Sequence, residues 1–257
     1  SDTTPVARRD LEVVERNARA LLFQVNELLE LAKVDAQQMK MAYAEADIAE
    51  LARFVAGHFE LAAQENGVDL LVEPAEALNA EVDVDKLRHI LFNLLSNAFK
   101  FTPRGGRVRL TARGAGARVT IEIADSGPGI PVEMRATVFE RFRRLDDASR
   151  RTSGVGGLGL SIAAELARLH AGGISIATAP EGGALFVLDL PREAPPGSTF
   201  GHPTDARDSS RQLLLDVETL RPSVTLADPE EQLDNAPLVL VVEDNVEMRQ
   251  FVASGLG

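Results

Sequence analysis

The chain has 257 residues, 45% of them hydrophobic and 26% charged, with 39 acidic side chains against 27 basic ones and no cysteine. This length allows one or two domains, and no apolar run approaches the ~18 residues that cross a bilayer, so we expect no membrane segment. The missing cysteines exclude disulfides, zinc–thiolate sites and thiol catalysis, and a net charge of -12 argues against binding to nucleic acid or anionic lipid. The first residues have neither a basic start nor an apolar core, so we expect a cytoplasmic segment.

Apolar residues in the first part of the chain recur in alternating steps of three and four. They are Leu11, Val14, Ala18, Leu21, Val25, Leu28 and Ala32. This heptad pattern predicts a long helix that packs on other helices. Leu22 and Leu29 widen the apolar stripe, which favours a four-helix bundle over a two-stranded coiled coil. A single amphipathic helix lying on its own domain is the alternative.

Residues 41–101 predict two strands and two helices. After a short strand over residues 41–46, Asp47 stands where a helix N-cap is expected, and helical spacing continues to Asn66 and Gly67. A second strand is expected over residues 68–72. Residues 83–101 predict another helix, whose buried face comprises Leu87, Ile90, Leu91, Leu94, Leu95 and Ala98.

The next part of the chain predicts four strands and one helix. Residues 108–111 and 119–123 alternate with period two across a glycine-containing turn, which predicts an antiparallel hairpin. A helix over residues 158–170 and strands over residues 174–177 and 185–190 follow. The sum predicts a two-layer α/β sandwich with helices on one face of a mixed sheet.

The chain changes character after residue 192. Residues 193–236 are rich in Pro, Ser, Asp and Gly and predict a linker. The apolar run over residues 238–242 then leads into Glu243 and Asp244, as at the end of the first strand of a parallel α/β domain.

Two amides and an ammonium share one face of the helix over residues 83–101. Asn93, Asn97 and Lys100 lie at i, i+4 and i+7. An amide oxygen can bind a hard cation such as Mg²⁺, and the amino groups can contact phosphate. A solvated polar face is the alternative if this segment is taken alone.

A carboxylate stands at the end of a predicted strand, before two glycines. Asp125 can accept a hydrogen bond from an exocyclic amine, and Gly127 and Gly129 let a flat ring approach the backbone. Taken by itself this pattern is also an ordinary turn.

A third glycine-rich segment, residues 154–160, leads into a helix. Free N–H groups at a helix start suit a phosphate. Gly154, Gly156 and Gly159 also match the dinucleotide pattern G-x-G-x-x-G, but no strand precedes them, which argues against that fold. No P-loop motif is present.

Together these segments resemble the ATP-binding domain of sensor histidine kinases, in the superfamily shared with DNA gyrase, a heat-shock chaperone and mismatch-repair ATPases. The similarity covers about residues 11–191. It rests on an N-box at residues 93–102, glycine boxes at 125–130 and 154–160, and an F-box at 139–142. The triplet Lys100-Phe101-Thr102 and the F-box favour kinases over an ATP-hydrolysing chaperone or repair clamp.

The resemblance implies that ATP and Mg²⁺ are the cofactors of a protein-histidine kinase. It implies a metal site at Asn97 with Asn93, charge neutralisation by Lys100, and recognition of the adenine amine by Asp125. The remaining nucleotide contacts that it implies are Phe101, Gly127, Gly129, Ile130, Phe142, Gly156, Gly157, Leu158, Gly159 and Leu160. Residues 141–156 would form a lid over the nucleotide.

The resemblance also divides the chain. Residues 1–40 would hold the second helix of a dimerisation bundle, 41–192 the ATP-binding domain, 193–236 a linker and 237–257 the start of a receiver domain. The expected partners are a second copy, through the N-terminal helix, and a receiver or response regulator. Glu243 and Asp244 resemble a receiver's acidic pair, whose acceptor aspartate would lie beyond Gly257.

Two departures from the family pattern keep an alternative open. Val155 stands where the family usually has glycine, and Ala184 where it often has a hydroxyl residue. The phosphoacceptor histidine is missing, since His58, His89, His170 and His202 all lack its context. His89 lies one turn before Asn93 and either borders the site or is an ordinary helix histidine. A degenerate nucleotide-binding scaffold that dimerises without transferring phosphate is therefore the second hypothesis.

Overall fold

The computed structural model describes residues 39–141 and 158–201, together with five single helical positions between 18 and 32. The elements in chain order are β1 (Ala44–Asp47), α2 (Ile48–Gly57), α3 (Glu60–Asn66), β2 (Asp69–Pro74), β3 (Asn79–Val82), α4 (Val84–Phe101), β4 (Arg107–Ala115), β5 (Arg118–Asp125), the 3₁₀ turn η1 (Val132–Met134), α5 (Gly159–Leu169), β6 (Gly173–Thr178) and β7 (Ala184–Pro191).

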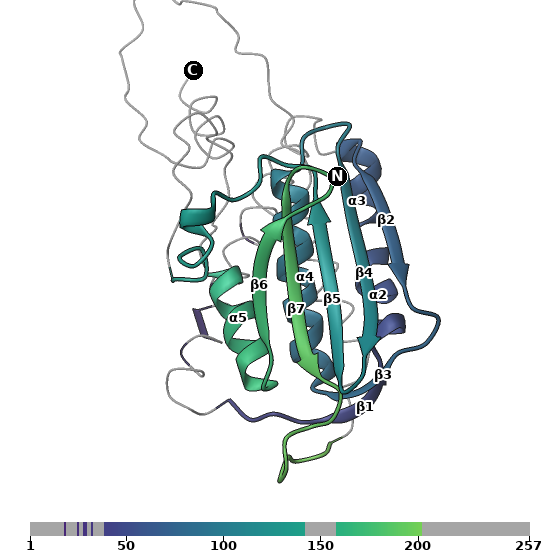
Figure 1. The fold of residues 1–257 in the computed structure, drawn as a ribbon, viewed down its shortest axis with the longest axis vertical. Helices are drawn as coiled ribbons and strands as arrows, with labels where there is room; N and C mark the ends of the chain where they lie inside the picture. The colour runs from purple at the N-terminus through teal and green to yellow at the C-terminus, as the bar shows by residue number, and fades with distance from the viewer. Residues whose placement is uncertain are drawn as a thin grey trace, which may run out of the picture.

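The main sheet has five strands in the order β2-β4-β5-β7-β6. Strands β2 and β4 are parallel and the other pairs are antiparallel, so the sheet is mixed. Helices α2, α4 and α5 lie together on one face of it, as Figure 1 shows. The predicted α/β sandwich is confirmed. Strands β1 and β3 form a separate small sheet.

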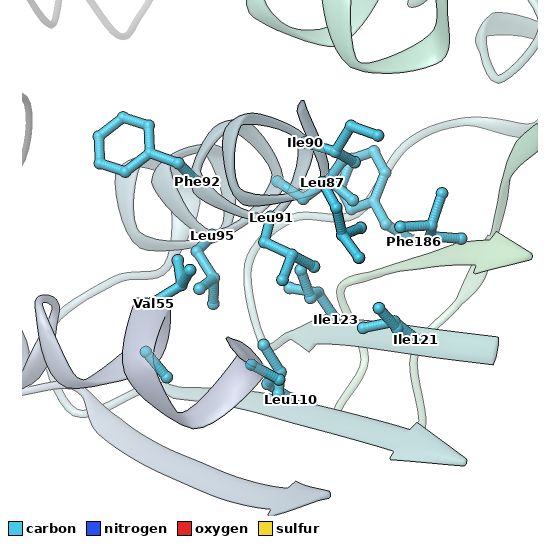
Figure 2. Packing of buried hydrophobic residues seen from close by; sticks show 14 of the residues in the cluster. Val55, Leu87, Ile90, Leu91, Phe92, Leu95, Leu110, Ile121, Ile123 and Phe186 are labelled. Atoms are coloured by element: carbon cyan, nitrogen blue, oxygen red, sulfur yellow. The ribbon is translucent and has the colours of Figure 1, made fainter. Parts of the chain in front are cut away.

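Helix α4 supplies the centre of the core. All six residues of its predicted apolar face are buried, and Leu91 and Leu95 point toward Leu110 of β4 and Ile123 of β5 (Figure 2). Each fully buried leucine contributes about 1.5–3 kcal/mol. The N-cap Asp83 begins the helix by accepting a hydrogen bond from the Lys86 N–H at 3.2 Å. The helix that carries the two amides is therefore held firmly against the sheet.

The predicted hairpin is present and longer than expected. Strands β4 and β5 pair from Val108 opposite Asp125 to Ala115 opposite Arg118. Only two residues connect them, and Gly116 adopts φ 61°, which suits glycine in a two-residue turn. The register brings the end of β5 beside the start of β4.

Residues 48–82 differ from the prediction in two respects. The single helix expected from residue 48 to residue 66 is two helices, because the N–H groups of His58 and Phe59 bond three residues back and end α2 just after Gly57. Strand β3 was missed, since Asn79-Ala80-Glu81-Val82 has no strand-like run. It exists through antiparallel pairing with β1.

Residues 193–201, the first part of the predicted linker, lie against the predicted ATP-binding-domain segment that begins at residue 41. The Tyr43 N–H donates to the Thr199 carbonyl at 2.9 Å, and the Gly201 N–H donates to the Tyr43 carbonyl at 3.0 Å. The Ala194 N–H also bonds to the Glu81 carboxylate at 2.9 Å. Residues 193–201 thus run beside β1 and β3, where the chain enters the domain.

A buried histidine joins α5 to the start of α4. The His170 Nε2 accepts a hydrogen bond from the Asp83 N–H at 3.2 Å, and Nδ1 lies 2.8 Å from the Leu166 carbonyl. Nε2 must be unprotonated to accept this bond, so the ring is neutral with its proton on Nδ1. Burial lowers the pKa of His170 below its ordinary 6.5, while Asp83 raises it and Lys86 lowers it.

We expect His170 to make the domain less stable in mild acid. Because its folded pKa is lowered, the unfolded chain binds this proton first, and the free energy of unfolding declines as the pH falls below about 6.5, by at most about 1.4 kcal/mol per pH unit. Urea titrations at pH 5.5, 6.5 and 7.5 measure this slope. His170→Gln should flatten it, whereas His58→Gln, at the residue that follows α2, should not. Equal slopes in wild type and His170→Gln would contradict the assignment.

Nothing among residues 39–141 and 158–201 forms a helix long and apolar enough to cross a membrane. The five described positions of the N-terminal heptad segment, Ala18, Val25, Leu28, Leu29 and Ala32, are helical and exposed. The other positions of that segment, the remainder of the linker and residues 237–257 lie outside the described residues.

Candidate functional site

The end of β5 holds a buried carboxylate. Asp125 is 3% exposed, and its Oδ1 accepts hydrogen bonds from the backbone N–H groups of Gly127 at 2.8 Å and Ala184 at 3.1 Å. Its carbonyl accepts a third bond, from the Gly183 N–H at 3.1 Å. No residue that the structure describes donates to Oδ2. One carboxylate oxygen is thus fixed by the protein while the other can serve a ligand.

The surroundings of Asp125 oppose its negative charge. Burial raises the pKa of this carboxyl, the two backbone N–H groups lower it, and the charge of Glu181 raises it again, so that the pKa lies above its usual 3.8. An N–H donor that approached Oδ2 would offset part of this cost. The site therefore favours a ligand that offers a hydrogen-bond donor.

Glycines leave room around this carboxylate. A Cβ on Gly183 would collide with Asp125 Oδ1, and a Cβ on Gly127 would lie 2.7 Å from the Phe101 carbonyl oxygen. Gly129 has φ 72°, and its Cβ would lie 3.4 Å from the Gly183 carbonyl. Only glycine permits these approaches. They bring together the end of α4, the loop after β5 and the turn between β6 and β7.

The amide face of α4 is partly buried. Asn93 is 3% exposed, and its Nδ2 is a buried donor with no hydrogen-bond partner among the described residues. Asn97 donates from Nδ2 to the Asn93 carbonyl at 2.9 Å, and no described group donates to its Oδ1. The Lys100 ammonium lies 5.6 Å from the centre of the Phe101 ring. An orphaned buried donor in a core helix indicates that something else satisfies it.

Helix α5 begins without a side-chain cap. Its N-cap residue, Leu158, is buried, and the Ser161 hydroxyl donates back to the Leu158 carbonyl at 2.7 Å instead of capping the first N–H groups. The first turn carries no acidic residue. The N–H groups at Gly159 and Leu160 and the positive end of the helix dipole therefore suit an anion.

These features gather at one end of the sandwich. In Figure 1 the arrowheads of β5 and β6 point to the same, upper edge of the sheet, where β5 ends and the turn before β7 begins. Helix α5 packs along α4. Ile130, five residues after Asp125, packs on the core and its carbonyl accepts a hydrogen bond from Arg135 at 3.0 Å. Phe101 is 40% exposed at the end of α4.

Part of the predicted site lies outside the described residues. This applies to Phe142, Val155, Gly156, Gly157 and most of the predicted lid. His89 is half-buried on α4. Nothing among the described residues forms a cluster of three or more His, Cys, Asp or Glu side chains that could hold a metal.

Sequence reasoning missed the turn between β6 and β7. Gly183 and Ala184 hold Asp125 by backbone N–H groups from 58 and 59 residues away, so the methyl side chain of Ala184 is compatible with this contact. The signal that could have revealed the turn is the pair Gly182-Gly183 between two predicted strands.

Comparisons with known proteins agree with this geometry. Residues 82–194 match the family described as histidine kinase-, DNA gyrase B-, and HSP90-like ATPase. The sensor histidine kinase TmoS of Ectopseudomonas mendocina is 44% identical over 249 residues, 95% of this chain. The chain carries a histidine-kinase ATP-binding domain. Hybrid signal transduction histidine kinase D of Dictyostelium discoideum is 41% identical over 192 residues, 72% of the chain.

Solved histidine kinases share the fold of this ATP-binding domain. The catalytic domain of ThkA superposes with a TM-score of 0.54 at 27% identity, over 60% of this chain and all of that domain. Full-length ShkA, solved in complex with AMPPNP, superposes with a TM-score of 0.65 at 31% identity, over 80% of this chain and 42% of ShkA. The present chain spans 26% of TmoS and 12% of the Dictyostelium kinase.

Proposed function

We propose that this chain is the ATP-binding catalytic core of a hybrid sensor histidine kinase. It binds Mg²⁺-ATP, transfers the γ-phosphoryl group to a histidine and passes it on to an aspartate of a receiver domain. The observation that carries the proposal is the arrangement at Asp125: a buried carboxylate with one oxygen fixed by backbone N–H groups and the other open, inside a cradle of glycines.

The base of the nucleotide is recognised by Asp125. The exocyclic amine of adenine donates to Oδ2, which no described residue occupies. Gly127 and Gly129 let the flat ring come close to the backbone, because the loop can pack against Phe101 and Gly183 only without side chains at these two positions. Phe101 and Ile130 offer apolar surface to the ring. Guanine presents a carbonyl oxygen where adenine has its amine, so Asp125 discriminates against it.

The phosphates are bound at the part of the site formed by the start of α5 and the end of α4. The uncapped start of α5, at Leu158, Gly159 and Leu160, supplies N–H groups and the positive end of its dipole, with Gly156 and Gly157 just before it. Lys100 neutralises phosphate charge from the end of α4. Phosphoryl transfer depends mainly on positioning and charge neutralisation, which this set of groups can supply.

The residues present fit a Mg²⁺ ion that is shared with the phosphates. Mg²⁺ keeps several waters and takes one or two protein oxygens when it also binds phosphate. Asn97, whose amino group is directed to the Asn93 carbonyl, leaves its amide oxygen for this role, and Asn93 lies one turn before it. When bound, the ion neutralises charge on the phosphates and orients them.

The histidine that accepts the phosphoryl group comes from outside the described domain. An imidazole nitrogen attacks the γ-phosphorus, the bond between that phosphorus and the β–γ bridging oxygen breaks, ADP leaves, and the imidazole loses its proton. His170 is buried and hydrogen-bonded at both nitrogens, so it is unsuited to this attack. We propose that the acceptor belongs to the dimerisation bundle to which residues 1–40 would contribute a helix.

The second copy and the receiver are the proposed partners. The exposed apolar heptad positions, with Val25 50% and Leu28 46% exposed, support pairing of two N-terminal helices. The strand-like run before Glu243 and Asp244 supports a receiver domain that follows the linker.

The test is a phosphorylation assay on the full-length protein with ATP labelled at the γ-phosphate. We expect label on the protein as an acid-labile, alkali-stable phosphohistidine, followed by an alkali-labile acyl phosphate on the receiver. The Asp125→Asn full-length variant, which should not bind ATP, is the control. A folded full-length protein that binds ATP and acquires no label would favour the degenerate scaffold.

A further inference from the structure

A partly buried ion pair lies beside the proposed adenine site. Arg109 of β4 donates from Nε to Glu181 Oε1 at 2.6 Å, and their side chains are only 22% and 13% exposed. The second oxygen of Glu181, Oε2, is buried and has no hydrogen-bond partner among the described residues. The pair joins positions 72 residues apart.

Glu181 belongs to the turn that holds Asp125. Two and three residues after it, the N–H groups of Gly183 and Ala184 bond to the carbonyl and to Oδ1 of Asp125. The turn is closed by the Gly182 N–H donating to the Ala179 carbonyl at 2.9 Å. Arg109 approaches from the sheet, since it is paired in register with Ala124, the residue before Asp125. The ion pair therefore ties the turn to the strands that carry the carboxylate.

We propose that Arg109 and Glu181 are positioning residues for Asp125, which fix the β6–β7 turn over the strand end and set the charge that Asp125 experiences. The proposal rests on the proposed function in one respect, because it takes Asp125 as the group that recognises adenine. The pair then controls nucleotide affinity through its charges, without touching the ligand.

The pKa values of Asp125, Glu181 and Arg109 depend on the charges of their neighbours. Glu181 is the charged group that raises the pKa of Asp125. Arg109 and Arg107 lower the pKa of Glu181. In turn, Glu181, Glu73 and Glu122 raise the pKa of Arg109. Arg109 is thus the ion-pair partner of Glu181, whose charge opposes ionisation of Asp125. Removing Glu181 and removing Arg109 should shift the pKa of Asp125 in opposite directions.

The two substitutions are therefore expected to move the ionisation of Asp125 to opposite sides of its wild-type pH. Glu181→Gln keeps an acceptor for Arg109 but removes the negative charge, so Asp125 ionises at lower pH. Arg109→Met leaves Glu181 uncompensated, so Asp125 ionises at higher pH. Only the carboxylate form accepts the adenine amine at Oδ2, so nucleotide affinity is lost as the pH falls through the pKa of Asp125.

The experiment measures the titration midpoint of the Asp125 carboxyl in the nucleotide-free protein and, separately, the affinity for nucleotide. Carbon-detected NMR titration of labelled aspartates in the nucleotide-free protein follows the Asp125 carboxyl directly. Calorimetry with ADP at pH 8 and at a pH below the wild-type midpoint from this titration gives the affinity of each variant relative to wild type at the same pH, which cancels the titration of the ligand. Arg113→Met, on the same strand, removes an exposed guanidinium that is paired with Glu122 and is the matched control, and Arg109→Lys retains the charge.

At pH 8 we expect the affinity of Glu181→Gln to lie within about twofold of wild type. Below the wild-type midpoint of the Asp125 carboxyl we expect tighter binding by Glu181→Gln and weaker binding by Arg109→Met, each on the order of threefold relative to wild type. Arg113→Met and Arg109→Lys should stay near wild type at both pH values.

The outcomes separate this inference from the proposed function. Opposite movements of the Asp125 carboxyl midpoint in Glu181→Gln and Arg109→Met support the inference, even if wild type were to bind no ADP and the proposed function were lost. Movement of both variants in the same direction would indicate structural damage alone and overturn the inference. So would an unchanged midpoint in two folded variants.

Discussion

Asp125→Asn should abolish nucleotide binding without weakening the fold. In the variant the amide oxygen can keep the bonds from Gly127 and Ala184, which then directs the amide NH₂ toward the adenine amine. Two donors face each other and the charged acceptor is gone, so we expect a loss of affinity of about 100-fold or more. Calorimetric titration of ADP and a nonhydrolysable ATP analogue, with and without Mg²⁺, measures this loss.

The same variant should unfold no more easily than wild type at pH 7. The pKa of Asp125 is raised in the folded state, so the folded protein binds this proton more tightly than the unfolded chain. The free energy of unfolding therefore falls as the pH rises through the window above pH 3.8, and a neutral amide removes that loss. Urea titrations at pH 4 and pH 7 should show the larger relative gain in the free energy of unfolding for Asp125→Asn at pH 7.

A control separates loss of this carboxylate from loss of any negative charge. Asp69→Asn removes a carboxylate that is half exposed on β2 and paired with Arg107. Its nucleotide affinity should equal that of wild type. Full affinity in folded Asp125→Asn would refute the role of Asp125 in adenine recognition.

Asn97→Ala should remove Mg²⁺-dependent binding of ATP and leave the fold intact. The substitution deletes the amide oxygen to which we assign the metal, and the only hydrogen bond it removes among the described residues is the one from Nδ2 to the Asn93 carbonyl. We expect the affinity for Mg²⁺-ATP to fall at least 10- to 100-fold, with a smaller change when Mg²⁺ is omitted. Calorimetry in magnesium and in EDTA gives both numbers.

Helix α3 offers a matched control for this variant. Asn66 donates from Nδ2 to the Ala62 carbonyl at 2.8 Å, the same bond to the residue four positions earlier, and is likewise half-buried. Asn66→Ala deletes this bond far along the chain from the site, and ATP should bind to it as to wild type. If Asn97→Ala retained full magnesium-dependent affinity, the metal role of Asn97 would be excluded.

The sequence by itself predicted most of the architecture, because the signals were local. The apolar spacing along residues 83–101 and its N-cap Asp83 specify α4, and alternation across Gly116 specifies the hairpin. The resemblance to histidine kinases, and with it the ATP-binding domain, also depended only on short motifs and their order. The roles of individual site residues remain predictions, for which Asp125 and Asn97 provide the sharpest tests.

Only the tertiary structure decided which distant segments complete the site. Strand β3 has no local signal and forms through β1, and the helix expected up to Asn66 is broken where the backbone bonds shift at His58 and Phe59. The backbone N–H of Ala184 reaches Asp125 through the β5–β7 pairing, and Glu181 meets Arg109 across the same sheet. Periodicity reports which face of an element is buried, whereas these contacts depend on strand order and register, which bring residues 59 and 72 positions apart into contact.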